Sequence, residues 1–116
     1  MNKIQKLNKE NISKVNTLAG NYRLYRIDKN GRRHIYVGRS DTDLQGRLLE
    51  HLYCDNPAYD EFEFECSNSV KDASNQECRD YHYFKNQNSG FILDNRNHPD
   101  TPDGMELYCP VPGCDK

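Results

Sequence analysis

Two runs of aromatic and β-branched residues flank an Asn30-Gly31 pair, and this arrangement constrains the fold more than any other feature of the sequence. GNYRLYRID precedes the pair and RRHIYVGRS follows it. An Asn-Gly pair between runs of this kind predicts a β-hairpin. Its loop could be Asn30-Gly31 alone, or Lys29-Asn30-Gly31 with Gly31 in the left-handed conformation. The choice decides which side chains share a face of the sheet.

A helix is predicted directly after the hairpin. Ser40 and Asp43 are spaced as in a capping box with Asp in place of Glu, so the helix should run from about Asp41 to Leu52. Leucines four residues apart (Leu44, Leu48, Leu52) form its core stripe. Arg47 and His51, also four residues apart, lie on the flank of that stripe, so we expect this pair to point toward the edge of the sheet.

Another strand and another helix are predicted in the second half of the chain. Residues 61–66, EFEFEC, alternate strictly and predict a strand with Phe62, Phe64 and Cys66 inward. Residues 69–85 have apolar side chains at helical spacing, and Glu77 lies in the middle of that stripe. A carboxylate on a core-facing stripe is costly unless it is paired, hydrogen-bonded or bound to a cation. Glu77 is therefore expected to have a specific partner.

The remaining segments define the predicted domain. Residues 1–18 have loosely helical apolar spacing and are expected to form a short helix or an arm. Residues 91–93 predict a short strand, and residues 98–116, rich in Pro, Asp and Gly, predict an irregular tail. Residues 19–97 then form one α+β domain. We expect a small mixed or antiparallel three-stranded sheet that starts with a β-hairpin and is flanked by two or three helices.

Composition excludes several classes of protein. No apolar run approaches the roughly 20 residues of a membrane-spanning helix, so no membrane association is expected. The polar N-terminus lacks a secretory signal, and five irregularly spaced cysteines do not suggest a disulfide framework, so we expect a cytoplasmic protein. The net charge is −2, but residues 1–53 carry 11 Lys/Arg against 5 Asp/Glu. Such asymmetry suits a basic face for a polyanion, although ordinary solvated surfaces also show it.

Zinc is a weaker hypothesis for the C-terminal residues. Cys109 and Cys114 form a C-x₄-C pair, and His98 precedes them. Structural zinc sites normally take four ligands from two tight pairs, and a second pair is missing. Free thiols are therefore the preferred interpretation.

The residues that stand out occur in a defined order: Gly20-Asn21-Tyr22, Tyr36-Val37-Gly38, Arg47, His51 and Glu77. In this order they resemble the signature of the GIY-YIG endonuclease family over about residues 19–97. Asn21 departs from the apolar residue usual in that family, and the gap between the tyrosines is longer than typical. The resemblance implies a metal-dependent endonuclease that hydrolyses phosphodiester bonds in DNA, in preference to RNA, with Mg²⁺ or Mn²⁺ as cofactor.

The resemblance also bears on the hairpin loop, because the site of this family requires both phenols on one face. A two-residue loop would pair Tyr25 with Tyr36 and place Tyr22 on the opposite face. A three-residue loop with a glycine bulge instead pairs Tyr22 with Gly38 and Leu24 with Tyr36. We therefore predict the three-residue loop.

The resemblance implies a role for each residue of the site. Tyr22, assisted by His51, would take the proton of the attacking water, and Tyr36 would orient the phosphate or the water. Arg47 would stabilise the phosphoryl charge, and Glu77 would hold one divalent cation. The family's asparagine is assigned to Asn95 in preference to Asn97. Contacts to nucleic acid are expected from Gly38, Arg39, Arg23 and Arg26. An ordinary phenol near pKa 10 is a poor base, so Tyr22 needs surroundings that favour phenolate.

Plainer interpretations compete with these roles. The tyrosines could simply fill the core, Arg47 and His51 could face solvent, and Glu77 could form an internal ion pair. The rival function is a catalytically silent module that binds nucleic acid or protein on the same fold. The near-neutral charge and the lack of a DNA-targeting motif predict weak affinity for duplex, unless the protein forms a homodimer or has a separate DNA-targeting partner.

Overall fold

The computed structural model describes residues 4–15, 17–55, 57–67, 69–86 and 90–95. Its elements are β1 (Gln5–Lys6), α1 (Lys9–Ile12), β2 (Gly20–Ile27), β3 (Arg33–Ser40), α2 (Leu44–Cys54), β4 (Glu61–Cys66), α3 (Val70–Lys85) and β5 (Ile92–Leu93). The strands form one sheet in the order β1-β4-β2-β3-β5. Only the β3–β5 pair is parallel among the pairs described. The α+β class is confirmed, but the prediction of three strands is wrong, because two short strands extend the sheet at its edges.

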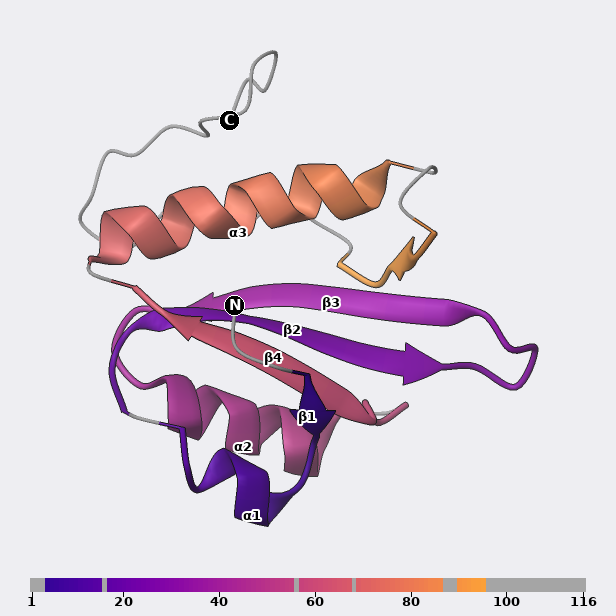
Figure 1. The fold of residues 1–116 in the computed structure, drawn as a ribbon, viewed down its shortest axis with the longest axis horizontal. Coiled ribbons are helices and arrows are strands. Elements are labelled where there is room, and N and C mark those ends of the chain that lie inside the picture. The colour runs from indigo at the N-terminus through magenta and orange to yellow at the C-terminus, as the bar shows by residue number, and fades with distance from the viewer. Residues whose placement is uncertain (1–3, 16, 56, 68, 87–89, 96–116) are drawn as a thin grey trace.

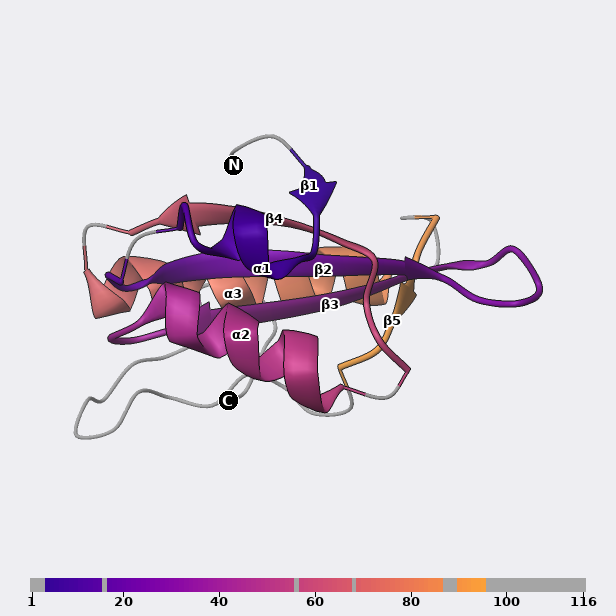
Figure 2. The same ribbon diagram turned by 90° about the horizontal axis from the view of Figure 1, so that it is seen from below.

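The helices cover both faces of the sheet. α3 lies on one side of the strands, and α1 and α2 lie on the other (Figures 1 and 2). The core on the α2 side includes Tyr22, Leu24, Leu48, Phe62 and Phe64. The core on the α3 side is formed by Ile35, Val37, Tyr81 and Phe84. The central strands are therefore buried on both faces, which determines where charged side chains can be placed.

The hairpin has the predicted three-residue loop. The Asp28 N–H donates to the Arg32 carbonyl at 2.9 Å, and Gly31 has a φ of +79°. Tyr22 pairs with Gly38, and Leu24 pairs with Tyr36. Both tyrosines therefore lie on the same face of the sheet, as predicted.

β4 matches its predicted bounds but not all of its predicted orientations. Phe62 and Phe64 are buried, whereas Cys66 is exposed at the end of the strand, opposite Gly20. The inward placement of Cys66 is therefore wrong. Glu63, on the opposite face from the phenylalanines, is also buried, and its carboxylate accepts from Arg23 and Tyr25 of β2. The strict alternation of apolar and acidic residues in β4 therefore does not separate a buried face from a solvent-facing one.

The helix α2 begins three residues later than predicted. β3 continues through Ser40, whose hydroxyl accepts from the Asp43 N–H at 2.8 Å within the turn that follows. The N-cap is Asp43, whose carboxylate accepts from the Gly46 N–H at 3.0 Å. Ser40 is therefore a turn residue, and the predicted capping box is shifted. The leucine stripe is retained, with Leu44 and Leu48 fully buried.

The N-terminal segment belongs to the same sheet and core as the rest of the molecule. β1 pairs with β4, and Leu7, Ile12 and Val15 contribute to the core beneath α2. The tail predicted at residues 98–116 lies outside the described residues, and so do its His98, Cys109 and Cys114. Asn97 also lies outside them. None of the described helices combines the length and apolarity needed to cross a membrane.

His34 on β3 connects three segments at one end of the sheet. Its Nε2 contacts the Asp28 carboxylate in the hairpin loop at 2.8 Å, and its Nδ1 contacts the Asp94 carboxylate after β5 at 2.8 Å. Partial burial disfavours the charged imidazole, but hydrogen bonds to Asp28 and Asp94 outweigh this and raise the pKa of His34. The hydrogen bond from His34, with backbone N–H donors, lowers the pKa of Asp28 to about 2. We call this group the His34 clasp.

The His34 clasp should make stability depend on pH. A raised His34 pKa gives a contribution that is complete below the unfolded value of about 6.5 and is lost as pH rises through the folded pKa. A lowered Asp28 pKa gives a contribution that is complete above about pH 4 and is lost as pH falls toward 2. Urea denaturation should therefore show that His34→Gln loses more stability at about pH 5 than at other pH values. The loss should be smaller near about pH 9, whereas Lys29→Gln in the same loop should cost little at either pH. A loss that grows with pH would contradict the clasp.

Candidate active site

Tyr22 and Tyr36 form the floor of a polar site beneath α2. Their ring centroids are 6.5 Å apart with an interplanar angle of 22°. Tyr22 is only 2% exposed, and its ring lies over the backbone of Gly38. A Cβ atom at position 38 would collide with the ring and hydroxyl of Tyr22. Gly38 therefore makes room for the Tyr22 ring. The contact to nucleic acid that was expected of Gly38 stays a prediction.

A chain of hydrogen bonds runs from Tyr22 through α2. The Tyr22 hydroxyl lies 2.7 Å from Nε2 of His51, and Nδ1 of His51 lies 2.8 Å from a carboxylate oxygen of Asp55. Because a carboxylate only accepts, Nδ1 carries a proton and donates it to Asp55 in the neutral imidazole. Nε2 is then free to accept the phenolic proton of Tyr22. The three side chains are arranged to pass a proton away from the Tyr22 oxygen.

Asp55 was not identified from the sequence, although a usable signal was present. It follows His51 by four residues, a spacing that places two side chains on one face of a helix. The predicted helix ended at Leu52, so Asp55 was not placed on it. In the structure α2 reaches Cys54, and Asp55 is its C-cap, with its N–H donating to the His51 carbonyl at 3.2 Å.

The surroundings of Tyr22 do not favour phenolate. Burial, together with the neighbouring Tyr36, raises the pKa of Tyr22 well above its ordinary value, and Arg47 offsets this only in part. The expected lowering of this pKa is therefore not found. Burial and the Glu77 carboxylate likewise raise the pKa of Tyr36. At neutral pH both residues are protonated phenols.

Glu77 acts electrostatically on the phenols although α3 packs on the other face of the sheet. Its carboxylate is near enough to both tyrosines to raise their pKa values. The residue is 9% exposed and forms an ion pair with Arg39. Arg39 also donates from Nε to Asp41 at 2.9 Å. Glu77 therefore forms the internal ion pair that was the competing prediction for this residue. Arg39 is held by two carboxylates, those of Glu77 and Asp41.

Arg47 is the cationic group of the site that retains access to solvent. It lies one helical turn before His51 on α2, and its side chain is 50% exposed. Its guanidinium contacts Glu50 at 3.6 Å, a pair across three residues of a surface helix. Such pairs contribute little and rearrange easily. Arg47 is therefore able to turn toward an anion placed beside Tyr22 and Tyr36.

The other two arginines expected to contact nucleic acid lie elsewhere and are held by carboxylates. Arg23 faces α3 and contacts Asp80 at 2.7 Å and Glu63 at 3.2 Å. Arg26 donates to Asp94 of the His34 clasp at 3.1 Å. Both guanidiniums neutralise buried or partly buried acids. The structure does not bring them to Tyr22.

The side chain of Asn95 binds the backbone at the edge of β3. Its side-chain amide accepts from the Val37 N–H at 2.9 Å and donates to the Val37 carbonyl at 2.8 Å. These two bonds continue the ladder that β5 begins at His34 and Ile35. Asn95 therefore fixes the strand that carries Tyr36 and Gly38.

Comparison of the chain with models of protein families, with curated proteins and with solved structures found no match. The resemblance to GIY-YIG nucleases therefore receives no support from these comparisons. Any functional assignment depends on the residues and geometry of the site.

A divalent cation is compatible with the donor chemistry at Glu77. Within the described residues no group of three or more His, Cys, Asp or Glu side chains could hold a metal ion. A hard cation can, however, be bound through one carboxylate, with water and substrate oxygens completing its shell. Glu77 already faces a positive group in Arg39, and Asp41 offers that guanidinium a second partner. The residues thus fit a cation that competes with Arg39 for Glu77.

Adding a methyl group at position 38 should disrupt the site and destabilise the fold. Gly38→Ala forces the Tyr22 ring to move, and overpacking of this kind costs about 1–3 kcal/mol. Urea denaturation should show this loss. The control Gly31→Asn changes a glycine with nothing within 4 Å of its added Cβ atom and should cost less than about 1 kcal/mol, because Asn tolerates the left-handed conformation. If Gly38→Ala is as stable as the wild type, the close contact with Tyr22 is not a packing constraint.

Proposed function

We propose that this chain is a metal-dependent endonuclease that hydrolyses phosphodiester bonds in DNA. The observation that carries the proposal is the hydrogen-bonded chain from Tyr22 through His51 to Asp55, with the Glu77 carboxylate in electrostatic range of the phenol. Phosphodiester hydrolysis needs a group that removes a proton from water and positive charge for the phosphoryl oxygens. The ordered motifs that resemble the GIY-YIG family support the same reaction.

Proton removal would proceed through Tyr22 without a preformed phenolate. As the Tyr22 oxygen takes the proton of the attacking water, its own proton passes to Nε2 of His51. The resulting imidazolium is stabilised by Asp55, which also holds the ring in the required orientation. The water oxygen forms the new bond to phosphorus while the bond to the leaving oxygen breaks. A raised Tyr22 pKa is compatible with this relay, because the phenol is never required to carry a full negative charge.

The remaining residues would bind and neutralise the phosphate. Arg47 presents a planar guanidinium that matches phosphate oxygens and retains access to solvent. Tyr36 would orient the phosphate or the water. Glu77 would hold Mg²⁺ or Mn²⁺, which when bound would neutralise charge on the phosphoryl and leaving oxygens. Arg39, released from Glu77, would keep its contact with Asp41.

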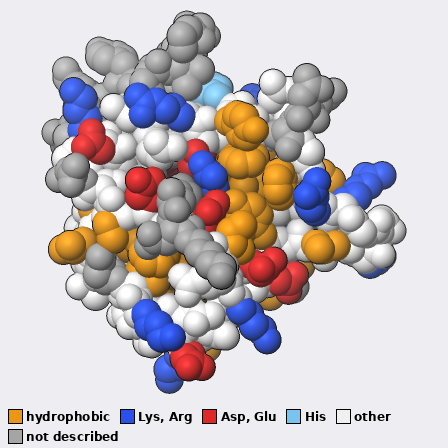
Figure 3. Space-filling view, in the orientation of Figure 1, with side chains coloured by type: hydrophobic (Ala, Val, Ile, Leu, Met, Phe, Trp, Pro, Cys, Tyr) orange, Lys and Arg blue, Asp and Glu red, His pale blue; other side chains and the backbone are white. Residues whose placement is uncertain are grey.

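Affinity for DNA is expected to be modest. On the face shown in Figure 3, the visible Lys and Arg side chains are interspersed with acidic ones, and no continuous basic patch is seen there. Neutralisation of phosphates supplies most non-specific affinity for DNA. Tight binding would therefore require a homodimer or a separate DNA-targeting partner.

Loss of any member of the proton relay should slow cleavage. His51→Ala and Tyr22→Phe should each lower kcat by about 10²- to 10⁴-fold, the usual contribution of a positioned acid–base group. Asp55→Asn should have a smaller effect than His51→Ala, because the imidazole remains but its preferred tautomer does not. Asp60→Asn, an exposed acid before β4, serves as the control. A Tyr22→Phe enzyme with unchanged kcat would rule out the relay.

Cleavage should require a divalent cation and Glu77. Incubation of supercoiled plasmid with the purified chain should give nicked product with Mg²⁺ or Mn²⁺ and none with chelator. Glu77→Gln should abolish nicking, whereas Asp72→Asn, an exposed acid on the same helix, should not. Isothermal titration with Mn²⁺ alone should show binding to the wild type that Glu77→Gln loses. Intact plasmid together with a gel mobility shift would instead support the catalytically silent binding module.

A further inference from the structure

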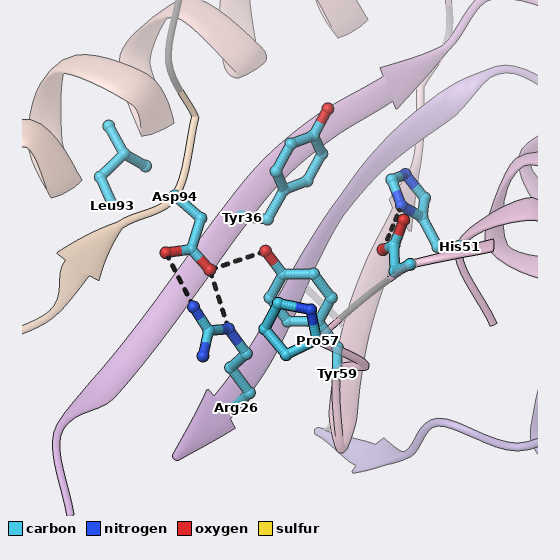
Figure 4. A pocket seen from close by; sticks show the side chains of 8 residues that line it. Arg26, Tyr36, His51, Pro57, Tyr59, Leu93 and Asp94 are labelled. Atoms are coloured by element: carbon cyan, nitrogen blue, oxygen red, sulfur yellow. Dashed lines mark hydrogen bonds and ion pairs between the residues drawn. The ribbon is translucent and has the colours of Figure 1, made fainter. Parts of the chain in front are cut away.

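A pocket of about 480 Å³ adjoins the proton relay, because His51 and Asp55 of the relay line it together with Tyr36. Its volume falls within the range usual for small-ligand sites. Figure 4 shows the rings of Tyr36, Tyr59 and His51 around this space, with Asp94 and Arg26 at another side. The proposed reaction uses only the edge of this pocket. The rest of it needs a separate explanation.

The aromatic side chains give the pocket a wall suited to a planar ligand. The Tyr36 ring centroid is 5.1 Å from that of His51 and 6.3 Å from that of Tyr59, with tilts of 57° and 52°. Tyr36 and Tyr59 are both partly exposed, so their rings are accessible. Aromatic side chains of this kind stack with nucleobases in proteins that bind single-stranded nucleic acid.

The charged groups of the pocket favour a neutral ligand with N–H donors over a second phosphate. Asp94 and Asp55 both line the space. Asp94 is oriented by the Tyr59 hydroxyl at 2.7 Å and by Arg26 at 3.1 Å, so it is fixed as an acceptor. Asp94 is balanced by Arg26 and also contacts His34 at 2.8 Å, so Asp55 is the carboxylate of the pocket without a cationic partner among the described residues. Asp55 binds His51 through one oxygen, and its other oxygen can accept a hydrogen bond from the amino or imino group of a nucleobase but would repel a phosphate. Arg26 is occupied by Asp94 and lies over the Tyr59 ring, 5.9 Å from its centroid.

We propose that this pocket binds an unpaired nucleobase next to the phosphate that is cleaved. The inference rests on the proposed nuclease function and names its substrate class: DNA with a single-stranded, bulged or extruded nucleotide. A paired base is stacked inside the duplex and cannot reach a pocket wall, whereas an unpaired base pays little to leave the stack. Because Tyr36 and His51 border both sites, a phosphate beside Tyr22 would have its neighbouring base at the pocket.

The test measures binding separately from cleavage. The probe is a DNA duplex with one bulged 2-aminopurine, compared with the same duplex in which 2-aminopurine pairs with thymine. Titration with the full-length Glu77→Gln chain, in chelator, avoids cleavage and reports stacking as quenching of fluorescence. We expect the bulged duplex to bind at least about tenfold more tightly than the paired one. Free 2-aminopurine deoxyriboside should bind far more weakly than the bulged duplex.

Variants of Tyr59 test whether the unpaired base binds in this pocket. Tyr59→Leu in the Glu77→Gln background should weaken binding of the bulged duplex by roughly 5- to 150-fold, the loss expected for one base–aromatic stack. Tyr59→Phe keeps the ring and loses only the hydroxyl bond to Asp94, so it should retain the preference for the bulge. Tyr83→Leu changes an exposed tyrosine of α3 as a control. Circular dichroism establishes whether each variant is folded, and Tyr59→Phe keeps the test valid if Tyr59→Leu is not.

Three outcomes would overturn the inference. Equal affinity for bulged and paired duplexes would remove the unpaired base as the ligand, and metal-dependent nicking of paired plasmid would still uphold the nuclease. A preference that survives in folded Tyr59→Leu would exclude this pocket. Equally tight binding of the free deoxyriboside would make it a nucleoside site. Conversely, a Tyr59-dependent preference for the bulge supports the inference even if no cleavage is detected, in which case only the nuclease proposal fails.

Discussion

The left-handed conformation of Gly31 fixes the register of the β2–β3 hairpin, on which the arrangement of the candidate site depends. It closes a three-residue loop that pairs Tyr22 with Gly38 and Leu24 with Tyr36. Because side chains alternate along a strand, a loop one residue shorter would place one of the two tyrosines on the α3 side. The observed register brings both phenols beneath α2. There His51 can reach Tyr22, and the missing side chain at position 38 leaves room for the Tyr22 ring.

The buried acidic side chains within the α3 layer are paired with arginines. Arg23 lies between Glu63 and Asp80, and Arg39 bridges to Glu77. An isolated buried carboxylate would be strongly destabilising, whereas a paired one is close to neutral for net stability. Within the described residues, no buried side-chain nitrogen or oxygen lacks a hydrogen-bond partner. A polar helix can therefore pack against the sheet, and Glu77 can lie near the phenols as a charged group.

The sequence was sufficient for the long periodic segments but not for their edges or for burial. Turn chemistry and alternation predicted the hairpin and β4, and helical spacing predicted α3. The short strand predicted at residues 91–93 is present as β5, but its pairing with β3 was not predicted. β1 has only two residues, too few for a pattern, and was missed. Asp55 was missed because the end of α2 was placed too early. The raised pKa of Tyr22 could not be predicted, since it depends on tertiary burial that a linear pattern does not reveal.

The amide of Asn95 has a consequence for how this protein behaves among other copies of itself. An edge strand with free N–H and C=O groups is a template for pairing with another chain. β3 pairs with β5 only at His34 and Ile35, but one side chain already occupies both backbone groups of Val37. An incoming strand would have to displace those bonds before it could extend the sheet. A single amide thus helps to prevent intermolecular β-sheet growth at the strand that carries Tyr36.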